Sequence, residues 1–297
     1  MLGASASMLS ASAGAEPRAS MYVSMHGSLV DYRVAWPEIA RLAAKIGYAG
    51  IEVNLSRAMR DGAERTLSLL RELRLKPSAM VFRLPIQTDQ TTFRTTLVKL
   101  DEAVRFAAEI GCPRLFDWVS ASTQTPKQEL LPIFKERVKA CAEVAARSNV
   151  RFGLEFLGAP DLRKRAPHEF IWRMDEMLDV AKQCGPNVGL VLDAFQWHHA
   201  GATTADIIAA GRQRIVHVHV SDSPDLPPEK ILDSERLMPG EGIIDLVGFF
   251  QALKKIGYED GVSPEPNSPK LKQVTPEEGA RMGLESTLRV MRRAGVA

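Results

Sequence analysis

The stretch Val188-Gly-Leu-Val-Leu-Asp193 decides the fold. It is a short apolar run, bounded by Pro186-Asn187, that ends on a carboxylate. A continuous apolar run of this length is typical of a strand buried on both faces, as in a parallel sheet covered by helices. Arg151-Phe-Gly-Leu-Glu155 and Ile215-Val-His-Val-His219 have the same form. The sequence therefore predicts parallel strands with a polar side chain at each carboxyl end.

Eight such runs alternate along the chain with longer stretches whose apolar residues recur every three or four positions. This alternation predicts βα units and an α/β fold. We expect one domain over residues 21–297, a (β/α)₈ TIM barrel with an eight-stranded parallel barrel inside and helices outside. The expected strands are residues 22–26, 50–54, 77–82, 114–119, 151–157, 188–194, 215–221 and 261–266.

The expected helices end at glycines. Helical patterns over 36–46 and 97–110 stop directly before Gly47 and Gly111, and Gly257 follows another such pattern. Glycine is common just after a helix because it adopts the left-handed conformation there without strain. Two connections are unusually long, at about 158–170 and 222–242. Both follow carboxyl ends of strands, the face on which TIM barrels build active sites, and we interpret the second as a flap.

Composition excludes several classes of protein. The 297 residues are 45% hydrophobic and carry a formal net charge of +2, and the sequence contains no run of five basic residues, so we expect no nucleic-acid partner. No stretch approaches the ~20 apolar residues of a membrane span, so we expect no membrane association and a cytoplasmic protein. The three cysteines are far apart and form no thiolate motif. Residues 1–20, rich in Ala, Ser and Gly, are predicted to be a disordered lead-in.

Four polar side chains end successive expected strands: Glu155, Asp193, His219 and Glu265. Buried carboxylates are costly unless something compensates their charge, and the barrel would bring all four to one point. Three carboxylates and one imidazole make a mostly oxygen site, which favours one divalent ion, Mn²⁺ first, with Mg²⁺ or Co²⁺ as alternatives. Taken singly, each residue could instead cap a helix or form a buried salt bridge.

An ordered set of motifs resembles the xylose-isomerase-like TIM barrels of the sugar phosphate isomerase/epimerase family, which share their fold with endonuclease IV. The resemblance runs from about Met21 to the C-terminus. The motifs are Gly153-Leu-Glu-Phe156, Leu190-Val-Leu-Asp-Ala-Phe-Gln-Trp-His198, His217-Val-His-Val-Ser-Asp222, Leu237-Met-Pro-Gly-Glu-Gly-Ile-Ile-Asp-Leu246, Ile256-Gly-Tyr258 and Pro264-Glu-Pro266. The resemblance implies that Glu155, Asp193, His219 and Glu265 are the metal ligands, and that Glu155 and Glu265 are the catalytic pair that moves protons.

The implied activity is that of a divalent-metal-dependent isomerase or epimerase of a sugar or polyol-derived ketone, which removes a proton next to a carbonyl through an enediolate. A lyase on the same scaffold is the alternative, either a keto-cyclitol dehydratase or an enzyme that cleaves a 3-keto glycoside by elimination. A small carbohydrate is the expected partner. Family resemblance also makes a homodimer or homotetramer an expectation.

Three further residues are candidates for substrate binding. Asp161 lies six residues after Glu155, where related epimerases place an acidic residue that binds a substrate hydroxyl; a surface aspartate is the alternative. Gln196 stands where the similar ketose epimerases carry a histidine that polarises a substrate oxygen, which is a departure from their pattern. His198 follows it and could contact substrate over the barrel mouth, or simply be a solvated loop residue.

Overall fold

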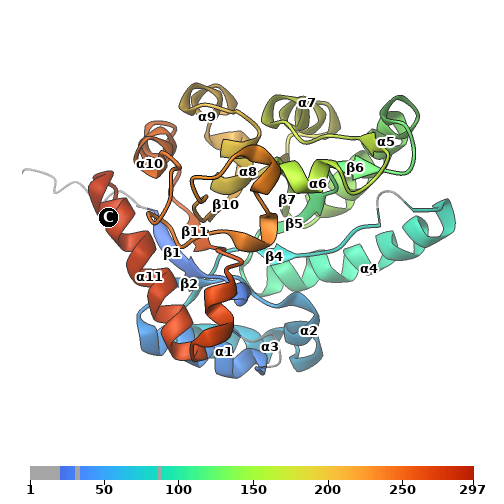
Figure 1. Cartoon of the computed structure of the whole chain (residues 1–297). Coiled ribbons are helices and arrows are strands. Elements are labelled where there is room, and N and C mark those ends of the chain that lie inside the picture. Colours follow the sequence, from blue (N-terminus) through green and yellow to red (C-terminus); the bar gives the residue numbers. More distant parts are fainter. Residues whose placement is uncertain (1–20, 31–33, 86–87) are drawn as a thin grey trace, which may run out of the picture.

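The computed structural model describes residues 21–30, 34–85 and 88–297. Its centre is a sheet in which all neighbouring strands are parallel, in the order β3-β2-β1-β11-β10-β9-β7-β5-β4 (Figure 1). The strands are β1 (Tyr22–Met25), β2 (Gly50–Ile51), β3 (Lys76–Pro77), β4 (Met80–Val81), β5 (Arg114–Val119), β7 (Arg151–Phe156), β9 (Val188–Asp193), β10 (Ile215–Val220) and β11 (Gly261–Pro264).

The two ends of this order are parts of one extended segment. Only Ser78 and Ala79 separate β3 from β4. The first part pairs with β2 and the second with β5, so the segment 76–81 acts as the third barrel strand and closes the sheet into a ring of eight. The predicted barrel is confirmed, and each expected strand has its counterpart.

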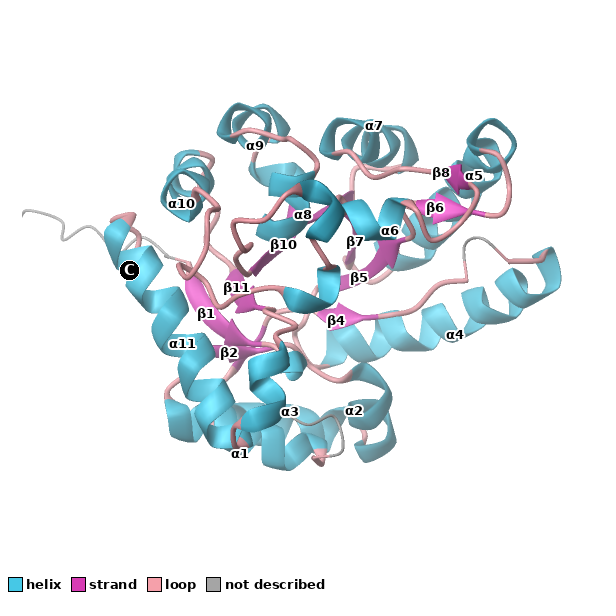
Figure 2. Ribbon diagram, in the orientation of Figure 1, coloured by secondary structure: helices cyan, strands magenta, loops and turns pink. Residues whose placement is uncertain are grey.

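Helices surround the ring on its outside (Figures 1 and 2). Within the described residues, eight of them pack side to side in chain order, α1-α3-α4-α5-α7-α9-α10-α11, and the last again contacts the first. No helix in the described part of the chain is long and apolar enough to cross a membrane. The helices are α1 (Trp36–Ile46), α2 (Leu55–Asp61), α3 (Ala63–Glu72), α4 (Gln90–Glu109), α5 (Lys127–Ala146), α6 (Pro160–Arg163), α7 (Met174–Cys184), α8 (Ala194–His199), α9 (Thr204–Ala210), α10 (Leu246–Lys255) and α11 (Pro276–Arg293).

Helix ends follow the local sequence. The helix predicted over 36–46 has those bounds, whereas α4 begins earlier than expected, at Gln90. The reason is Asp89, whose side chain accepts a hydrogen bond from the Thr92 N–H at 2.9 Å and caps the helix there. The glycines predicted to end helices, at 47, 111 and 257, all have positive φ, between 73° and 101°.

The core has two parts. The larger lies between the strands and the helices, and a small cluster of Ala79, Phe116 and Val191 forms a second part. Gly153 of β7 is a glycine because a Cβ there would lie 2.9 Å from the Val191 side chain and 3.0 Å from that of Phe116. This tight packing fills the barrel beneath its carboxyl-terminal mouth.

The two long connections lie over that mouth. The connection after β7 contains α6 and then β8 (His168–Glu169), which pairs antiparallel with β6 (Ser122–Thr123) from the connection after β5. The connection after β10 contains the short 3₁₀ helices η3 (Pro228–Lys230) and η4 (Asp233–Glu235). At the base of this second connection, Asp222 is fully buried and accepts hydrogen bonds from three backbone N–H groups, those of Ser223, Gly240 and Ile244.

The predicted lead-in, residues 1–20, lies outside the described residues.

Candidate metal centre and active site

The four predicted ligands meet at the carboxyl-terminal mouth of the barrel. Glu155, Asp193, His219 and Glu265 each offer one ligand atom, and these four atoms lie within 4.8 Å of one another. Glu155 is on β7, Asp193 ends β9, His219 is on β10 and Glu265 directly follows β11. Because four neighbouring strands of the ring each deliver one side chain, the fold itself builds the cluster.

Asp193 links the cluster to the local structure. It is the last residue of β9 and the N-cap of α8, and its Oδ1 accepts a hydrogen bond from the Gln196 N–H at 2.8 Å. Its Oδ2 lies 3.2 Å from the Arg236 guanidinium. One oxygen therefore caps α8, while the other faces the guanidinium group of Arg236.

His219 turns one ring nitrogen toward the acidic side chains. Its Nδ1 lies 3.3 Å from Glu265 Oε2 and 3.6 Å from Glu155 Oε1, yet it is buried and makes no hydrogen bond among the described residues. Its Nε2 lies 3.1 Å from Glu52 Oε1. A buried nitrogen without a hydrogen bond needs an explanation, and a lone pair directed at a cation supplies one.

Arg236 brings a positive charge into the cluster from the connection after β10. Its NH1 lies 3.2 Å from both Asp193 Oδ2 and Glu265 Oε2, and its NH2 donates to Asp233 at 2.7 Å. The side chain is 3% exposed, so these contacts form in a setting where charges interact strongly. Arg236 offsets part of the negative charge of the three carboxylates.

The two glutamates differ in their affinity for a proton. Burial raises the pKa of Glu155 to about 7, although the nearby His219 ring opposes the shift. Burial would also raise the pKa of Glu265, but the charges of His219 and Arg236 outweigh it and hold that pKa below its ordinary value. In the metal-free protein the proton therefore resides on Glu155 before it resides on Glu265.

The donor set fits a divalent cation. Three carboxylates and one imidazole suit hard and borderline ions, and the His219 Nδ1 described above is a ready donor. A zinc ion also accepts this combination of histidine and carboxylate ligands. The four residues would therefore hold one divalent ion.

Three of the four clustered residues line a pocket of about 770 Å³. Glu155, His219 and Glu265 line it together with Trp118, whose side chain projects from β5 beside Glu155 in the strand register. Trp118 is 40% exposed, and the Arg83 guanidinium lies 3.5 Å from the centre of its ring. Clefts of this volume with a few convergent polar groups are typical of small-molecule sites.

A family model described as "Xylose isomerase-like TIM barrel" matches residues 40–292. The chain belongs to this family. The resemblance inferred from the sequence motifs is thereby confirmed.

Several proteins are similar to this xylose isomerase-like barrel in sequence. The inosose isomerase of Bacillus licheniformis is 32% identical over 167 residues, which cover 54% of this chain and 58% of that protein. The putative hydroxypyruvate isomerase of Mus musculus is 28% identical over 173 residues, covering 56% and 58%. The chain thus spans a little over half the length of the curated relatives it matches.

Solved structures share the fold. A xylose isomerase domain protein from Alicyclobacillus acidocaldarius superposes with a TM-score of 0.85 at 24% identity, covering 93% of this chain and 100% of that chain. The crystal structure of the IOLI protein, which has a bound zinc atom, gives a TM-score of 0.79 at 22% identity, covering 92% and 99%. At these identities the likeness concerns the fold alone.

The residues predicted to bind substrate lie beside the pocket of this xylose isomerase-like barrel rather than on its lining. The Gln196 side chain is fully buried, accepts a hydrogen bond from the Ala159 N–H and donates one to Asp233. Asp161 on α6 accepts from the Asp233 N–H and pairs with Arg165. His198 is half-buried near the end of α8, against the His199 ring. Their predicted contacts with substrate stay predictions.

Three residues of the site were missed in the sequence. His26 and Glu52 line the pocket and directly follow β1 and β2. A polar side chain at the carboxyl end of an apolar strand, the pattern that indicated the four ligands, therefore indicates these two residues as well. Arg236 lies in a long connection, and nothing in its local sequence distinguishes it from the other arginines.

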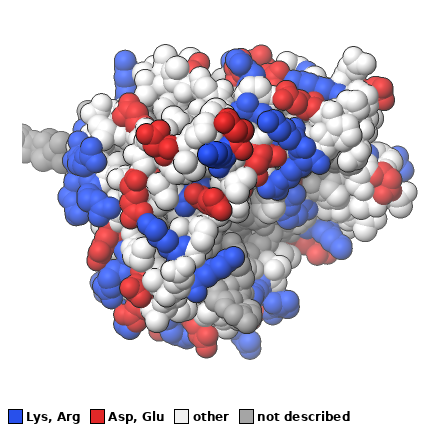
Figure 3. Space-filling view, in the orientation of Figure 1, with Lys and Arg blue, Asp and Glu red and all other residues white. Residues whose placement is uncertain are grey.

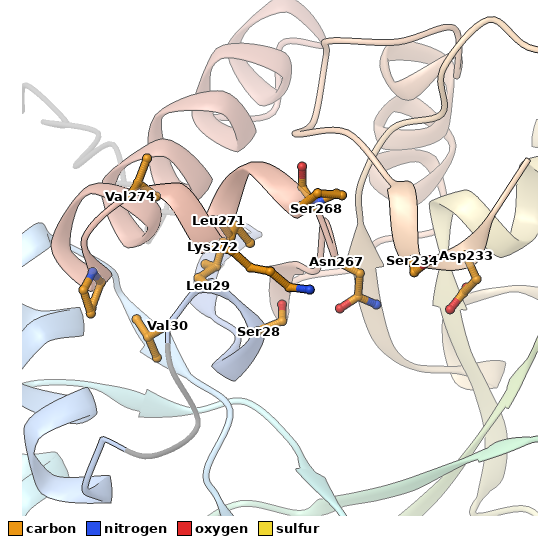
Figure 4. A pocket seen from close by; sticks show the side chains of 12 residues that line it. Ser28, Leu29, Val30, Asp233, Ser234, Asn267, Ser268, Leu271, Lys272 and Val274 are labelled. Atoms are coloured by element: carbon orange, nitrogen blue, oxygen red, sulfur yellow. The ribbon is translucent and has the colours of Figure 1, made fainter.

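A second pocket has a volume of about 620 Å³ (Figure 4). Ser28 borders it on one side, Asn267 and Lys272 on another, and Asp233 on a third, and none of the four clustered ligands lines it. Asp233 also binds Arg236 and Gln196, so this pocket adjoins the site through one shared residue. On the face shown in Figure 3, acidic and basic side chains are interspersed.

Proposed function

We propose that the chain is a divalent-metal-dependent isomerase or epimerase that removes a proton next to the carbonyl of a sugar or polyol-derived ketone. The observation that carries the proposal is the cluster of Glu155, Asp193, His219 and Glu265, three of which line a pocket, with the Nδ1 atom of His219 facing the carboxylates without a hydrogen bond. The names of the curated relatives, which are isomerases, support it.

The proposed roles follow from the places of the side chains. When bound, a divalent ion held by the four residues would act as a Lewis acid and stabilise the negative charge of an enediolate. Glu155 is on β7 and Glu265 directly follows β11, three strands away in the ring of eight, so we propose that their carboxylates reach the substrate from different sides. One takes the proton from carbon, and the other, on the opposite face, returns one, which inverts that carbon. A single glutamate that serves both carbons would isomerise instead.

For the substrate, we propose a cyclic polyol ketone as the first compound to test. The name inosose isomerase supports this choice. The pocket volume of about 770 Å³ exceeds what a six-membered ring with its hydroxyls fills, so 3-keto glycosides belong in the same panel. Asp161, Gln196 and His198 remain our candidates for contacts with substrate hydroxyls, through movement of α6 and α8, the short helices that carry them.

The test combines metal analysis with proton exchange. The purified protein is analysed for bound metal and then incubated in D₂O with each ketone, with Mn²⁺, Mg²⁺, Co²⁺ or Zn²⁺ added in turn. We expect about one ion per chain and deuterium at the carbon next to the carbonyl. Glu155→Gln should abolish exchange while keeping the fold, and Glu109→Gln, an exposed glutamate on α4, is the matched control.

The products separate the alternatives. Deuterium with a changed configuration or a moved carbonyl supports an isomerase or epimerase, whereas an unsaturated or shortened product supports the lyase. Bound metal without exchange into any ketone of the panel would contradict the proposed reaction. Absence of metal binding would contradict the four-ligand centre. A homodimer or homotetramer, which we also propose, is measured by light scattering on the same sample.

A further inference from the structure

Glu52 is the meeting point of three imidazoles. Its Oε1 lies 3.0 Å from His217 Nε2 and 3.1 Å from His219 Nε2, and its Oε2 lies 3.6 Å from His26 Nε2. The carboxylate is 7% exposed and directly follows β2, on the side of the barrel away from the strands of the four ligands. A buried carboxylate needs donors to offset its burial, and here histidine Nε2–H groups are those donors.

The hydrogen bonds decide which ring nitrogen carries the proton. A neutral imidazole has one N–H donor and one acceptor nitrogen, and a carboxylate can only accept. The Nε2 atoms of His217 and His219 must therefore carry protons in order to bond to Glu52. The Nδ1 atoms of both rings are buried without a hydrogen bond among the described residues, which agrees with a proton on Nε2 and a lone pair on Nδ1.

For His219 this assignment has a chemical consequence. Its Nδ1 lone pair faces Glu155 and Glu265, in the middle of the four-residue cluster. If the proton moved to Nδ1, it would occupy the place where a cation must bind. Histidines that bind metals in proteins commonly donate their other N–H to a carboxylate, which fixes the ring and strengthens the ligand.

We propose that Glu52 is a positioning residue of the metal centre: it holds His219 with its proton on Nε2, so that Nδ1 is a preformed metal donor. The inference rests on the metal site of the proposed function but is independent of the substrate and of the reaction. Ser263 supports the network from the other side, since its Oγ lies 3.0 Å from His217 Nε2. That contact concerns His217 and not His219.

Metal affinity tests the inference. Mn²⁺ and Zn²⁺ binding is measured by titration calorimetry on the metal-free protein. Glu52→Met removes the acceptor at similar volume and should weaken metal binding about 10- to 100-fold. Glu52→Gln keeps an acceptor oxygen but loses the charge, so it should restore part of the affinity. Ser263→Ala is the matched control, because it removes a partner of His217 alone and should change the affinity less than about threefold.

A second measurement needs neither metal nor substrate. Because the charges of Glu52 and Glu265 outweigh burial and raise the pKa of His219 well above its usual value, the tautomer is read at alkaline pH, where the ring is neutral. Nitrogen NMR of the metal-free protein labelled at histidine should there show His219 protonated at Nε2 in the parent chain. In Glu52→Met the proton should shift toward Nδ1. If Glu52→Met does not fold, Glu52→Gln carries both measurements, with a smaller loss of affinity.

Three outcomes would overturn the proposal. The first is a parent protein whose His219 carries its proton on Nδ1, and the second is an unchanged metal affinity in a folded Glu52→Met. The third is a parent protein that binds two ions per chain while Glu52→Gln binds one. Glu52 would then be a ligand of a second ion, which it could hold together with His26 and His219. Metal binding and the tautomer as proposed, but no deuterium exchange, would contradict the proposed reaction alone.

Discussion

Replacement of Asp222 by alanine should loosen the whole connection between β10 and α10. The Asp222 carboxylate is fully buried and accepts from the N–H groups of Ser223 and Ile244 at 2.9 Å and of Gly240 at 3.0 Å. These groups lie at the two ends of the connection that carries Arg236. Without the carboxylate, three backbone donors lose their acceptor at once.

The magnitude follows from those three bonds. A hydrogen bond to a charged group contributes about 1.5–3 kcal/mol to stability, but bonds that share one carboxylate are not additive. We therefore expect Asp222→Ala to lower the free energy of unfolding by about 3–5 kcal/mol. Asp222→Asn can keep Oδ1 as the acceptor for the N–H groups of Ser223 and Ile244. Its new amide group would face the Gly240 N–H, so two donors would meet there. We expect this variant to lower the free energy of unfolding by about 1.5–3 kcal/mol.

Urea unfolding followed by circular dichroism measures the change, with limited proteolysis to detect opening of residues 223–244. Asp225→Ala is the matched control, because Asp225 is an exposed aspartate of the same connection and its loss should change stability by less than about 0.5 kcal/mol. An Asp222→Ala protein as stable as the control would refute the reasoning, since it would mean that water replaces the carboxylate without cost.

Three other predictions concern packing, charge and metal. Gly158→Ala should lower the free energy of unfolding by at least about 2 kcal/mol in the same urea assay. The reason is that a Cβ there would lie 2.2 Å from the Gln196 carbonyl oxygen and 2.8 Å from the Ala200 nitrogen. An unchanged urea midpoint would contradict this close approach. Arg236→Gln should destabilise the metal-free protein by about 3–5 kcal/mol, since two buried carboxylates lose their cation, and added Mn²⁺ should then raise the melting temperature more than in the parent; equal stability of the two metal-free proteins would contradict the role of Arg236. Removal of metal by a chelator should lower the melting temperature. Adding the ion back at a free concentration of about 100 times its Kd should raise the free energy of unfolding by about 2.7 kcal/mol. A melting temperature independent of chelator and ion would argue against a bound metal.

Much of this molecule could be predicted from its sequence because the barrel repeats one local rule eight times. An apolar run such as 188–193 must be buried on both faces, and its carboxyl end must then lie at the common mouth of the barrel. That rule predicts that Glu155, Asp193, His219 and Glu265 lie together. The same rule applied to the strands at 22–26 and 50–54 would also have indicated His26 and Glu52.

Other parts of the site depend on long-range packing that no local pattern encodes. Arg236 reaches the carboxylates only because the connection after β10 folds back over the mouth and is held by Asp222. The hydrogen bonds of Gln196 come from the packing of α8 against the start of α6, whose position a sequence does not give. Even the third strand, expected over 77–82, is divided into β3 and β4, because its two halves pair with different neighbours.

The divided strand, residues 76–81, is where the sheet closes into a barrel, and we call it the seam. Its two halves contribute two paired residues each to their neighbours, whereas β5 and β7 are paired over six residues. Amide hydrogens near the seam should exchange with solvent sooner than those of β7, because local opening follows the least extensive hydrogen bonding. Val81, Phe82 and Arg83 continue from this seam into the pocket wall. The part of the pocket wall that β4 leads into should therefore open more readily than β7, the strand that carries Glu155.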